Sequence, residues 1–184
     1  MGRKPLKHLD TTLDSGVDLT NRYLFVDREI SYDEVEELMR GFHLLELASS
    51  EPITIVINSP GGDVYSGLAL YDMFRTSKCE IITKGYGLIA SMASILFLAG
   101  TTRILSPNAR YMVHSIQSWV AGSSADVKIE AEEIKKLEDY LKKIYSKHTN
   151  KKALFWRKLD RNKYFNAEEC LNMGVATAIM GFKE

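Results

Sequence analysis

The chain has 184 residues, a length that suits a single domain with a sizeable hydrophobic core. Its 24 basic residues balance 24 acidic ones, which excludes a strong net field for nucleic acid or an anionic membrane. The sequence has no bilayer-length apolar segment and no signal-peptide h-region, and Cys79 and Cys170 lack metal-ligand spacing, so we expect a soluble, cytoplasmic protein with two buried thiols.

The first half of the chain alternates between strand and helix patterns. Residues 1–20 carry no steady hydrophobic period and are expected to form an N-terminal arm. Ser31 opens a capping-box motif, and the β-branched run at 53–57 is typical of a buried parallel strand. The elements expected here are a strand at 22–27, a helix from 31 to 48, a strand at 53–57, a turn at 58–63 and a helix at 64–74.

The second half continues the alternation. Residues 80–86 predict a strand, which leads into an apolar helix that opens at Ser91 and runs to Gly100. The remaining elements are strands at 102–105 and 110–114, a long amphipathic helix at 123–148, and a short helix that Asn166 caps and Gly174 ends. Strands alternating with helices indicate an α/β fold, and without a repeat or linker residues 21–184 are expected to form one domain.

One small hydroxyl stands where a strand meets a helix. Gly85 and Gly87 permit a tight turn that would place Ser91 in the first turn of the apolar helix. Unpaired backbone N–H groups there favour negative charge, so Ser91 is a candidate nucleophile with the N–H of Met92 facing the oxyanion. The alternative is that Ser91 is only a small residue that lets the helix pack closely.

A second strand-to-helix turn and one histidine complete a candidate constellation. Such turns gather at the carboxyl ends of parallel strands, so Gly61 and Gly62 would lie near Ser91, with the N–H of Gly62 as a second oxyanion donor. His114 closes a predicted strand, whereas His148 near the end of the long helix is expected to act as a cation on the helix dipole. The plainer alternatives are a tight glycine turn and a partly buried structural histidine.

A series of short motifs runs through the chain from about residue 20 to about residue 180. The segments are 57–62, 70–72, 90–92, 105–108, 112–114, 148–149 and 164–169. Taken together and in this order, they resemble the ClpP family, the proteolytic subunits of ATP-dependent Clp proteases. Several motifs in series are far more specific than any one of them alone.

The resemblance implies a ClpP/crotonase-type α/β fold, a spiral of ββα units with a protruding handle at about 116–149. It implies that Ser91 is the nucleophile and His114 the general base, and that the N–H groups of Gly62 and Met92 form the oxyanion hole. Subunits of this family form homo-oligomers of two stacked seven-membered rings, which enclose a chamber where unfolded polypeptide is cleaved. No metal or organic cofactor is implied, and a partner AAA+ unfoldase would spend the ATP, since the chain has no P-loop.

The chain departs from the family pattern at the third position of the catalytic triad, where Asn162 replaces an aspartate. An amide can orient the imidazole of His114 but cannot stabilise imidazolium by charge, so slow or conditional hydrolysis is expected. Asp160 and Arg161 match a family pair that bridges the two rings, and the resemblance implies the same ring–ring contact for them.

Two further departures concern the unfoldase and the pore. Thr54 and Val56 stand where the family has tyrosines that help to form the docking pocket, so unfoldase binding is expected to be altered. Residues 1–20 match the axial gating segment of the family poorly, so the resemblance does not predict how access through the pore is controlled. Ser94 stands where the family has a small residue and is interpreted as a packing residue.

Other functions stay open on the sequence alone. A catalytically weak ring subunit that co-assembles with an active paralogue is favoured by Asn162 and opposed by the retained Ser91 and His114. A crotonase-like acyl-CoA enzyme would share the fold and the oxyanion hole but leave Ser91 idle. A Ser–Lys dyad with Lys84 is a further variant, although strand alternation gives no reason to bring Lys84 to Ser91.

Overall fold

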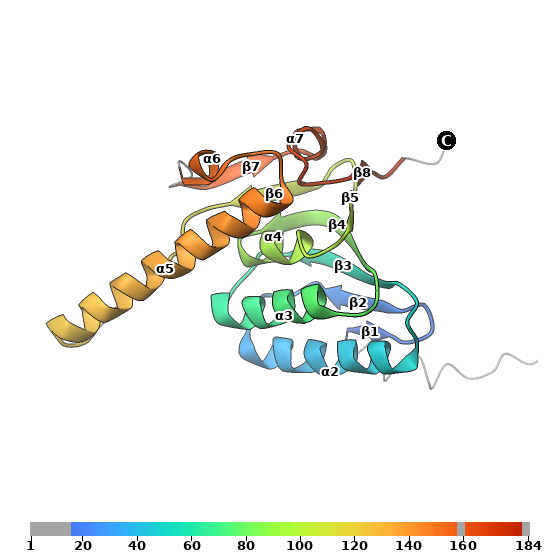
Figure 1. Cartoon of the computed structure of the whole chain (residues 1–184), viewed down its shortest axis with the longest axis horizontal. Coiled ribbons are helices and arrows are strands. Elements are labelled where there is room, and N and C mark those ends of the chain that lie inside the picture. The colour runs from blue at the N-terminus through green and yellow to red at the C-terminus, as the bar shows by residue number, and fades with distance from the viewer. Residues whose placement is uncertain (1–15, 158–160, 182–184) are drawn as a thin grey trace, which may run out of the picture.

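The computed structural model describes residues 16–157 and 161–181, which build one sheet with helices packed against it (Figure 1). Four neighbouring strands run parallel in the order β2 (Tyr23–Val26), β3 (Ile53–Ser59), β4 (Ile81–Ala90) and β5 (Thr102–Leu105). The helices that follow β2, β3 and β4 are stacked one above another beside the sheet (Figure 1). They are α2 (Tyr32–Ala48), α3 (Val64–Thr76) and α4 (Met92–Phe97). The expected α/β fold is confirmed.

Capping residues and buried side chains explain the first helices. Ser31 and Asp63 cap α2 and α3, each accepting a backbone N–H from three residues further on, at 3.3 and 2.7 Å. Phe42 of α2 and Phe74 of α3 pack with ring centroids 5.0 Å apart. Residues 53–55 of β3 are buried without alternation, as expected for a parallel strand covered on both faces.

β4 changes its neighbour halfway along. Its first half pairs with β5 and its second half pairs with β6 (Arg110–Val113). Gly87 lies between the halves with φ +54°, where a Cβ would come within 2.6 Å of the side-chain oxygen of Asn58, and that oxygen accepts the N–H of Leu88 at 3.1 Å. The glycines expected to make a strand-to-helix turn therefore lie inside the strand, and the turn itself comes at Ser91.

Short elements at the edges of the sheet are not predicted by the sequence. β1 (Val17–Asp18) pairs antiparallel with β2, and Val17 is buried, so the last part of the expected loop at 1–20 belongs to the sheet. The other unexpected elements are β7 (Lys163–Phe165), antiparallel to β6, β8 (Ala178–Ile179), parallel to β5, and α6 (Ala153–Arg157). Elements of two to five residues are too short to show a hydrophobic period.

The last short helix forms as the sequence predicts. The amide side chain of Asn166 accepts the N–H of Glu169, and the Glu169 carboxylate accepts the N–H of Asn166, both at 2.8 Å. This reciprocal capping box opens α7 (Ala167–Asn172). Gly174, with φ +72°, follows its end.

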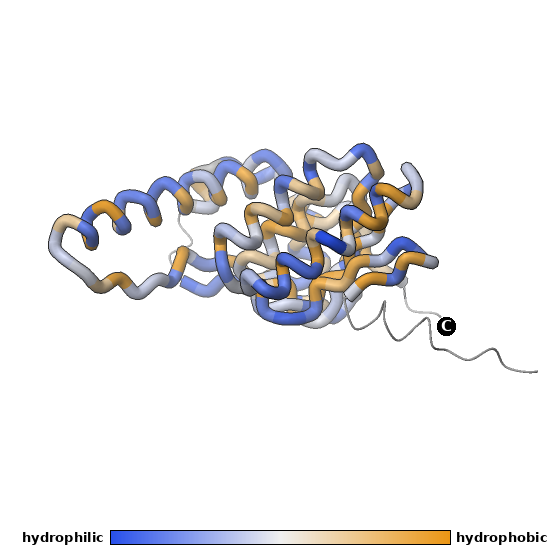
Figure 2. The backbone as a smooth tube through the Cα atoms, turned by 90° about the horizontal axis from the view of Figure 1, so that it is seen from below, coloured by the Kyte–Doolittle hydropathy of each residue, from blue (hydrophilic) through white to orange (hydrophobic). Residues whose placement is uncertain are grey.

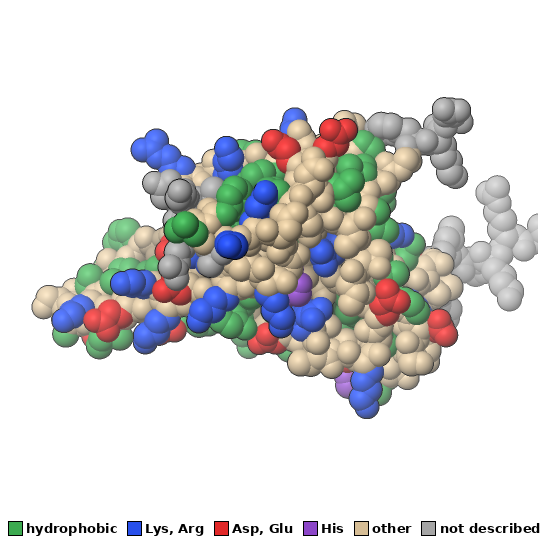
Figure 3. Space-filling view, turned by 45° about the horizontal axis from the view of Figure 1, so that its top comes forward, with side chains coloured by type: hydrophobic (Ala, Val, Ile, Leu, Met, Phe, Trp, Pro, Cys, Tyr) green, Lys and Arg blue, Asp and Glu red, His purple; other side chains and the backbone are tan. Residues whose placement is uncertain are grey.

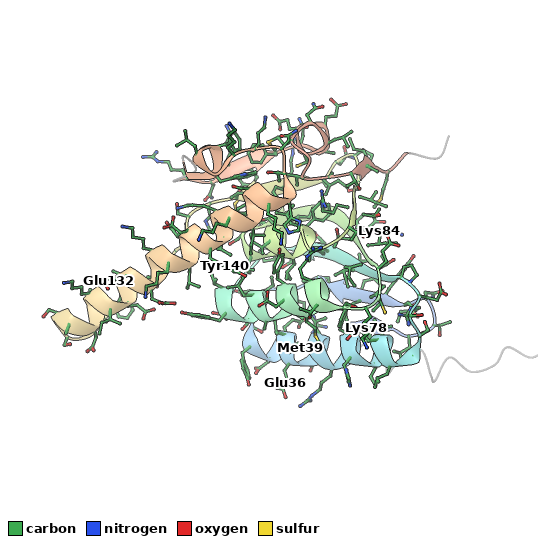
Figure 4. The ribbon with its side chains drawn as sticks, viewed as in Figure 1. Glu36, Met39, Lys78, Lys84, Glu132 and Tyr140 are labelled. Atoms are coloured by element: carbon green, nitrogen blue, oxygen red, sulfur yellow. The ribbon has the colours of Figure 1, made fainter. Side chains whose placement is uncertain are left out.

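α5 (Ser124–His148) projects from the rest of the fold as an arm (Figure 1). The chain leaves β6, runs outward over 115–122 without helix or strand, and returns as α5 (Figure 2). Charged side chains of both signs are interspersed with apolar ones along the arm (Figure 3). Glu132 lies on its outer half (Figure 4), whereas Ile144 and Tyr145 near its end are buried and anchor it to the core.

Candidate active site

Ser91 occupies the turn between β4 and α4. Its backbone has φ +53° and ψ −123°, a conformation that costs a non-glycine residue on the order of 1–3 kcal/mol. The N–H of Ser91 donates to the carbonyl of Met112 on β6 at 2.9 Å, which ties the turn to the neighbouring strand. A serine on such a sharp strand-to-helix turn presents its Oγ at the end of the sheet, as a nucleophile requires. Ser91 is the N-cap of α4 and not, as expected, a residue of its first turn.

His114 directly follows β6 and faces Ser91. Its Nε2 lies 2.7 Å from Ser91 Oγ, the geometry of a hydrogen bond between a nucleophile and a general base. The two residues are 23 positions apart in the chain, and the pairing of β4 with β6 brings them together. Burial lowers the pKa of His114 below 6.5, so the imidazole is neutral at pH 7 and can accept the hydroxyl proton.

The second ring nitrogen of His114 is buried without a partner. Its Nδ1 makes no hydrogen bond to any residue that the structure describes. Asn162, expected to orient the ring, is exposed and lines the same hollow as His114, and no hydrogen bond joins these two described residues. Arg161 is exposed in the same hollow, and Asp160 lies outside the described residues. The structure thus brings Asn162 near the base without making it a partner.

Two glycines allow the backbone to approach the nucleophile closely. A Cβ on Gly61, where φ is +92°, would lie 2.7 Å from Ser91 Cβ and 2.8 Å from Met92 N. The backbone ladder with Ile30 uses the peptide groups on either side of Gly62, at 2.8 and 2.7 Å, and leaves the N–H of Gly62 pointing away from Ile30. The N–H of Met92 opens α4 and has no partner within that helix. Both expected oxyanion donors, Gly62 and Met92, line the same cleft as Ser91.

A buried chain of hydroxyl groups behind Ser91 is missing from the sequence interpretation. Ser94 Oγ donates to the carbonyl oxygen of Ser91 at 2.5 Å and lies 2.6 Å from the hydroxyl of Tyr145. Tyr111 OH donates to the carbonyl of Ser94 at 2.9 Å. Ser94 is therefore a hydrogen-bonding residue and more than the packing residue that the sequence suggested. The signal available in the sequence was a hydroxyl within an otherwise apolar run, and the structure buries it fully.

A cleft of about 580 Å³ opens beside Ser91, between the start of α3, β6 and α5. Its volume lies in the usual range for ligand sites. Apolar and charged side chains both line it, among them Ile95, Met112, Ile134, Leu137, Leu141, Glu130, Glu138 and Lys142. The N–H of Ile116 donates to the Glu138 carboxylate at 3.2 Å, which holds the chain after His114 along the cleft.

Two other residues considered in the sequence lie elsewhere in the fold. Burial lowers the pKa of His148 to about 4, and its Nε2 lies 2.8 Å from the hydroxyl of Tyr71, so His148 is a neutral hydrogen-bonding residue and not the expected cation. Lys84 lies on the first half of β4 (Figure 4), with Nζ 5.4 Å from the ring centroid of Tyr23. This position excludes a Ser–Lys dyad between Lys84 and Ser91.

In the part of the chain that the structure describes, no three His, Cys, Asp or Glu side chains are grouped so that they could hold a metal ion. Cys79 and Cys170 are buried, free thiols, as expected. None of the helices at 16–157 and 161–181 is long and apolar enough to cross a membrane.

Comparison with known proteins gives a consistent result. A family model described as Clp protease matches residues 12–183. The ATP-dependent Clp protease proteolytic subunit 2 of Treponema denticola is 34% identical over 167 residues, covering 88% of this chain and 82% of that protein. The ATP-dependent Clp protease proteolytic subunit of Deinococcus radiodurans is 33% identical over 166 residues, covering 88% of this chain and 81% of that protein. Subunit 2 of Nocardia farcinica is 35% identical, covering 85% and 79%.

Proposed function

The chain belongs to the Clp protease family and is a serine peptidase of this type, and we propose that Ser91 is its nucleophile and His114 its general base. The observation that carries this proposal is the 2.7 Å hydrogen bond between Ser91 Oγ and His114 Nε2. A crotonase-like acyl-CoA enzyme would need no such pair, so the geometry favours peptide hydrolysis on this fold.

The proposed reaction begins with attack of Ser91 Oγ on the carbonyl carbon of a peptide bond, while His114 Nε2 takes the hydroxyl proton. The carbonyl oxygen becomes an oxyanion, which the N–H groups of Gly62 and Met92 stabilise. His114 then gives its proton to the departing amine, and an acyl-enzyme forms at Ser91. Water, activated by His114, releases the acyl group and restores the serine.

We propose that hydrolysis is slow, because His114 lacks a charged partner. In a serine protease the change of the triad aspartate to asparagine lowers kcat by about 10⁴-fold. Here Nδ1 of His114 makes no hydrogen bond within the described residues, and the nearby Asn162 carries no charge. The imidazolium that forms during attack is therefore stabilised neither by charge nor by a fixed hydrogen bond.

The proposed substrate is unfolded polypeptide or short peptide, bound extended along the segment that follows His114 and lines the cleft. We propose that the chain assembles into stacked heptameric rings, with 116–149 as the handle and only the part of residues 1–20 that precedes β1 as an axial arm. Docking of an AAA+ unfoldase is altered in this proposal, because Thr54 on β3 is buried and offers little contact surface. The free thiols suit a reducing compartment, and we place the reaction in the cytoplasm.

A fluorophosphonate probe tests the proposal directly, because it labels an activated serine. The purified full chain is compared with Ser91→Ala, His114→Ala and Asn162→Asp for labelling and for hydrolysis of a fluorogenic peptide. We expect labelling to be lost in the first two variants and hydrolysis to be faster in the third. Labelling that survives Ser91→Ala would remove Ser91 from the role of nucleophile.

A second candidate function is a catalytically weak ring subunit that co-assembles with an active Clp proteolytic subunit. The unpartnered Nδ1 of His114 favours it, because a subunit with little catalytic duty does not need an oriented base. Native mass spectrometry after co-expression with an active subunit of the same source would detect mixed rings. Rings of this chain alone that hydrolyse peptide at Ser91 would exclude this second candidate.

A further inference from the structure

Three buried hydroxyl groups lie behind the catalytic serine, and their hydrogen bonds have a single consistent direction. Ser94 Oγ uses its one proton to bind the carbonyl oxygen of Ser91 at 2.5 Å. It therefore cannot donate to Tyr145, so the Tyr145 hydroxyl donates to Ser94 Oγ across 2.6 Å. Tyr111 OH is committed elsewhere, since it donates to the carbonyl of Ser94 at 2.9 Å.

The carbonyl of Ser91 and the N–H of Met92 belong to the same peptide group. The carbonyl accepts two protons, from Ser94 Oγ at 2.5 Å and from Ser94 N at 3.0 Å. Hydrogen bonds in a chain polarise one another, so donation to this carbonyl makes the N–H at the other end of the peptide a stronger donor. The same two bonds fix the plane of the peptide and hence the direction of the Met92 N–H.

We propose that Tyr145 and Ser94 are positioning residues, a two-hydroxyl relay that orients and polarises the Ser91–Met92 peptide as an oxyanion donor. This inference rests on the proposed peptidase function and deepens it. It concerns neither substrate contact nor proton transfer. Ser94 is fully buried and binds the Ser91 carbonyl, and the Tyr145 hydroxyl binds Ser94, while the Tyr145 side chain also lines the cleft. The relay also joins the anchored end of α5 to the catalytic turn, because Tyr145 belongs to that helix.

Tyr145 is held well enough to act as a fixed donor. Its ring stacks on Trp156 with centroids 4.7 Å apart and an interplanar angle of 19°. Both side chains are buried, Tyr145 at 5% and Trp156 at 2% exposure. Burial raises the pKa of Tyr145 far above its usual value, so the hydroxyl keeps its proton over the whole working range of pH.

The rate test uses Tyr145→Phe, Ser94→Ala and the double variant, with Tyr140→Phe as the matched control from the same helix. Loss of a whole oxyanion donor lowers kcat by about 10²–10³-fold, and polarisation adds about 10–30% to a hydrogen bond. Tyr145→Phe is therefore expected to lower kcat about two- to eightfold with KM within about twofold. In the Ser94→Ala background, the same change is expected to lower kcat no further, because the relay is already broken.

A spectroscopic test does not depend on activity. Among the seven methionines of [15N]methionine-labelled protein, the Met92 amide is assigned by its loss in Met92→Leu. We expect its proton resonance to move upfield in Tyr145→Phe and to stay in place in Tyr140→Phe. Thermal unfolding of each variant ensures that only folded protein is compared.

The outcomes separate the relay from the peptidase proposal. An unchanged Met92 amide in Tyr145→Phe overturns the relay, and so does an equal fall of kcat in both backgrounds. If the amide moves in folded protein that lacks Ser91-dependent hydrolysis, the relay stands and the peptidase assignment fails. An upfield shift together with a kcat loss that Ser94→Ala abolishes supports both.

Discussion

The two sides of Ser91 are built very differently. On the oxyanion side, two glycines, a backbone ladder with Ile30 and the hydroxyl of Ser94 hold the backbone, and each contact leaves little freedom. On the base side, His114 has its 2.7 Å bond to Ser91, and its Nδ1 is buried without a partner among the described residues.

The difference concerns which charge each side can stabilise during the proposed reaction. The oxyanion side consists of main-chain groups whose positions are set by close packing, so it is ready to stabilise negative charge. The base side lacks the fixed charge that would stabilise imidazolium. We expect substitutions that disturb the backbone around the oxyanion donors to destroy activity. Substitutions near His114 that add negative charge are expected to increase it.

The largest effect is expected from Gly61→Ala. A Cβ there would lie 2.6 Å from the carbonyl of Ala90 and 2.8 Å from Met92 N, so the turn must move and misplace the oxyanion donors. We expect kcat to fall by about 10²–10³-fold in peptide hydrolysis. Gly181→Ala is the matched control, since no heavy atom of the described residues, its chain neighbours aside, lies within 4 Å of its Cβ position. Activity of Gly61→Ala within threefold of wild type would show that the close packing is dispensable.

Asn162→Asp is expected to have the next largest effect, in the opposite direction. It places a carboxylate beside the hollow that Asn162 shares with His114, where negative charge stabilises imidazolium. We expect kcat/KM to rise about ten- to a hundredfold, less than the roughly 10⁴-fold effect of a fully formed triad, because no hydrogen bond joins Asn162 to the ring of His114. The exposed Asn108→Asp controls for added charge. If the rate of peptide hydrolysis by Asn162→Asp is unchanged or lower, the missing negative charge is not what limits His114 as a base.

The smallest effect is a displacement of the pH profile. His114 is active when neutral, so the rate falls as pH drops through its folded pKa, which burial lowers below 6.5. The acid limb of kcat/KM should therefore have its midpoint below 6.5 in the wild type. In Asn162→Asp the midpoint should move up, because the carboxylate favours the charged imidazole. A wild-type midpoint at or above 6.5 would contradict the isolated, desolvated base.

Local patterns in the sequence were sufficient to predict the main elements and to select residues that the structure brings together. Ser31 and Asn166 begin helices because their side chains cap them, and these signals lie within four residues of chain. Ser91, His114 and Gly62 were singled out by strand ends and by motif resemblance, and the structure brings all three to one cleft.

Features that depend on distant partners were not predictable. The role of Ser94 is set by Tyr145, which lies 51 residues further along the chain. His148 has the position of a helix-dipole cation, but its burial against Tyr71 makes it neutral. β4 changes its partner because β6 pairs with its second half, and the residue pattern within β4 does not indicate this pairing.

The close approach of Asn58 to Gly87 fixes the register of β4 ahead of Ser91. The N–H of Leu88 donates to Asn58 Oδ1 at 3.1 Å, which fixes β4 at a point three residues before Ser91. Because successive side chains of a strand point to opposite faces, a slip or insertion of one residue in 88–90 would turn the hydroxyl away from the imidazole. The three residues 88–90 thus set the position of the proposed nucleophile, and we expect a change in their number to separate Ser91 from His114.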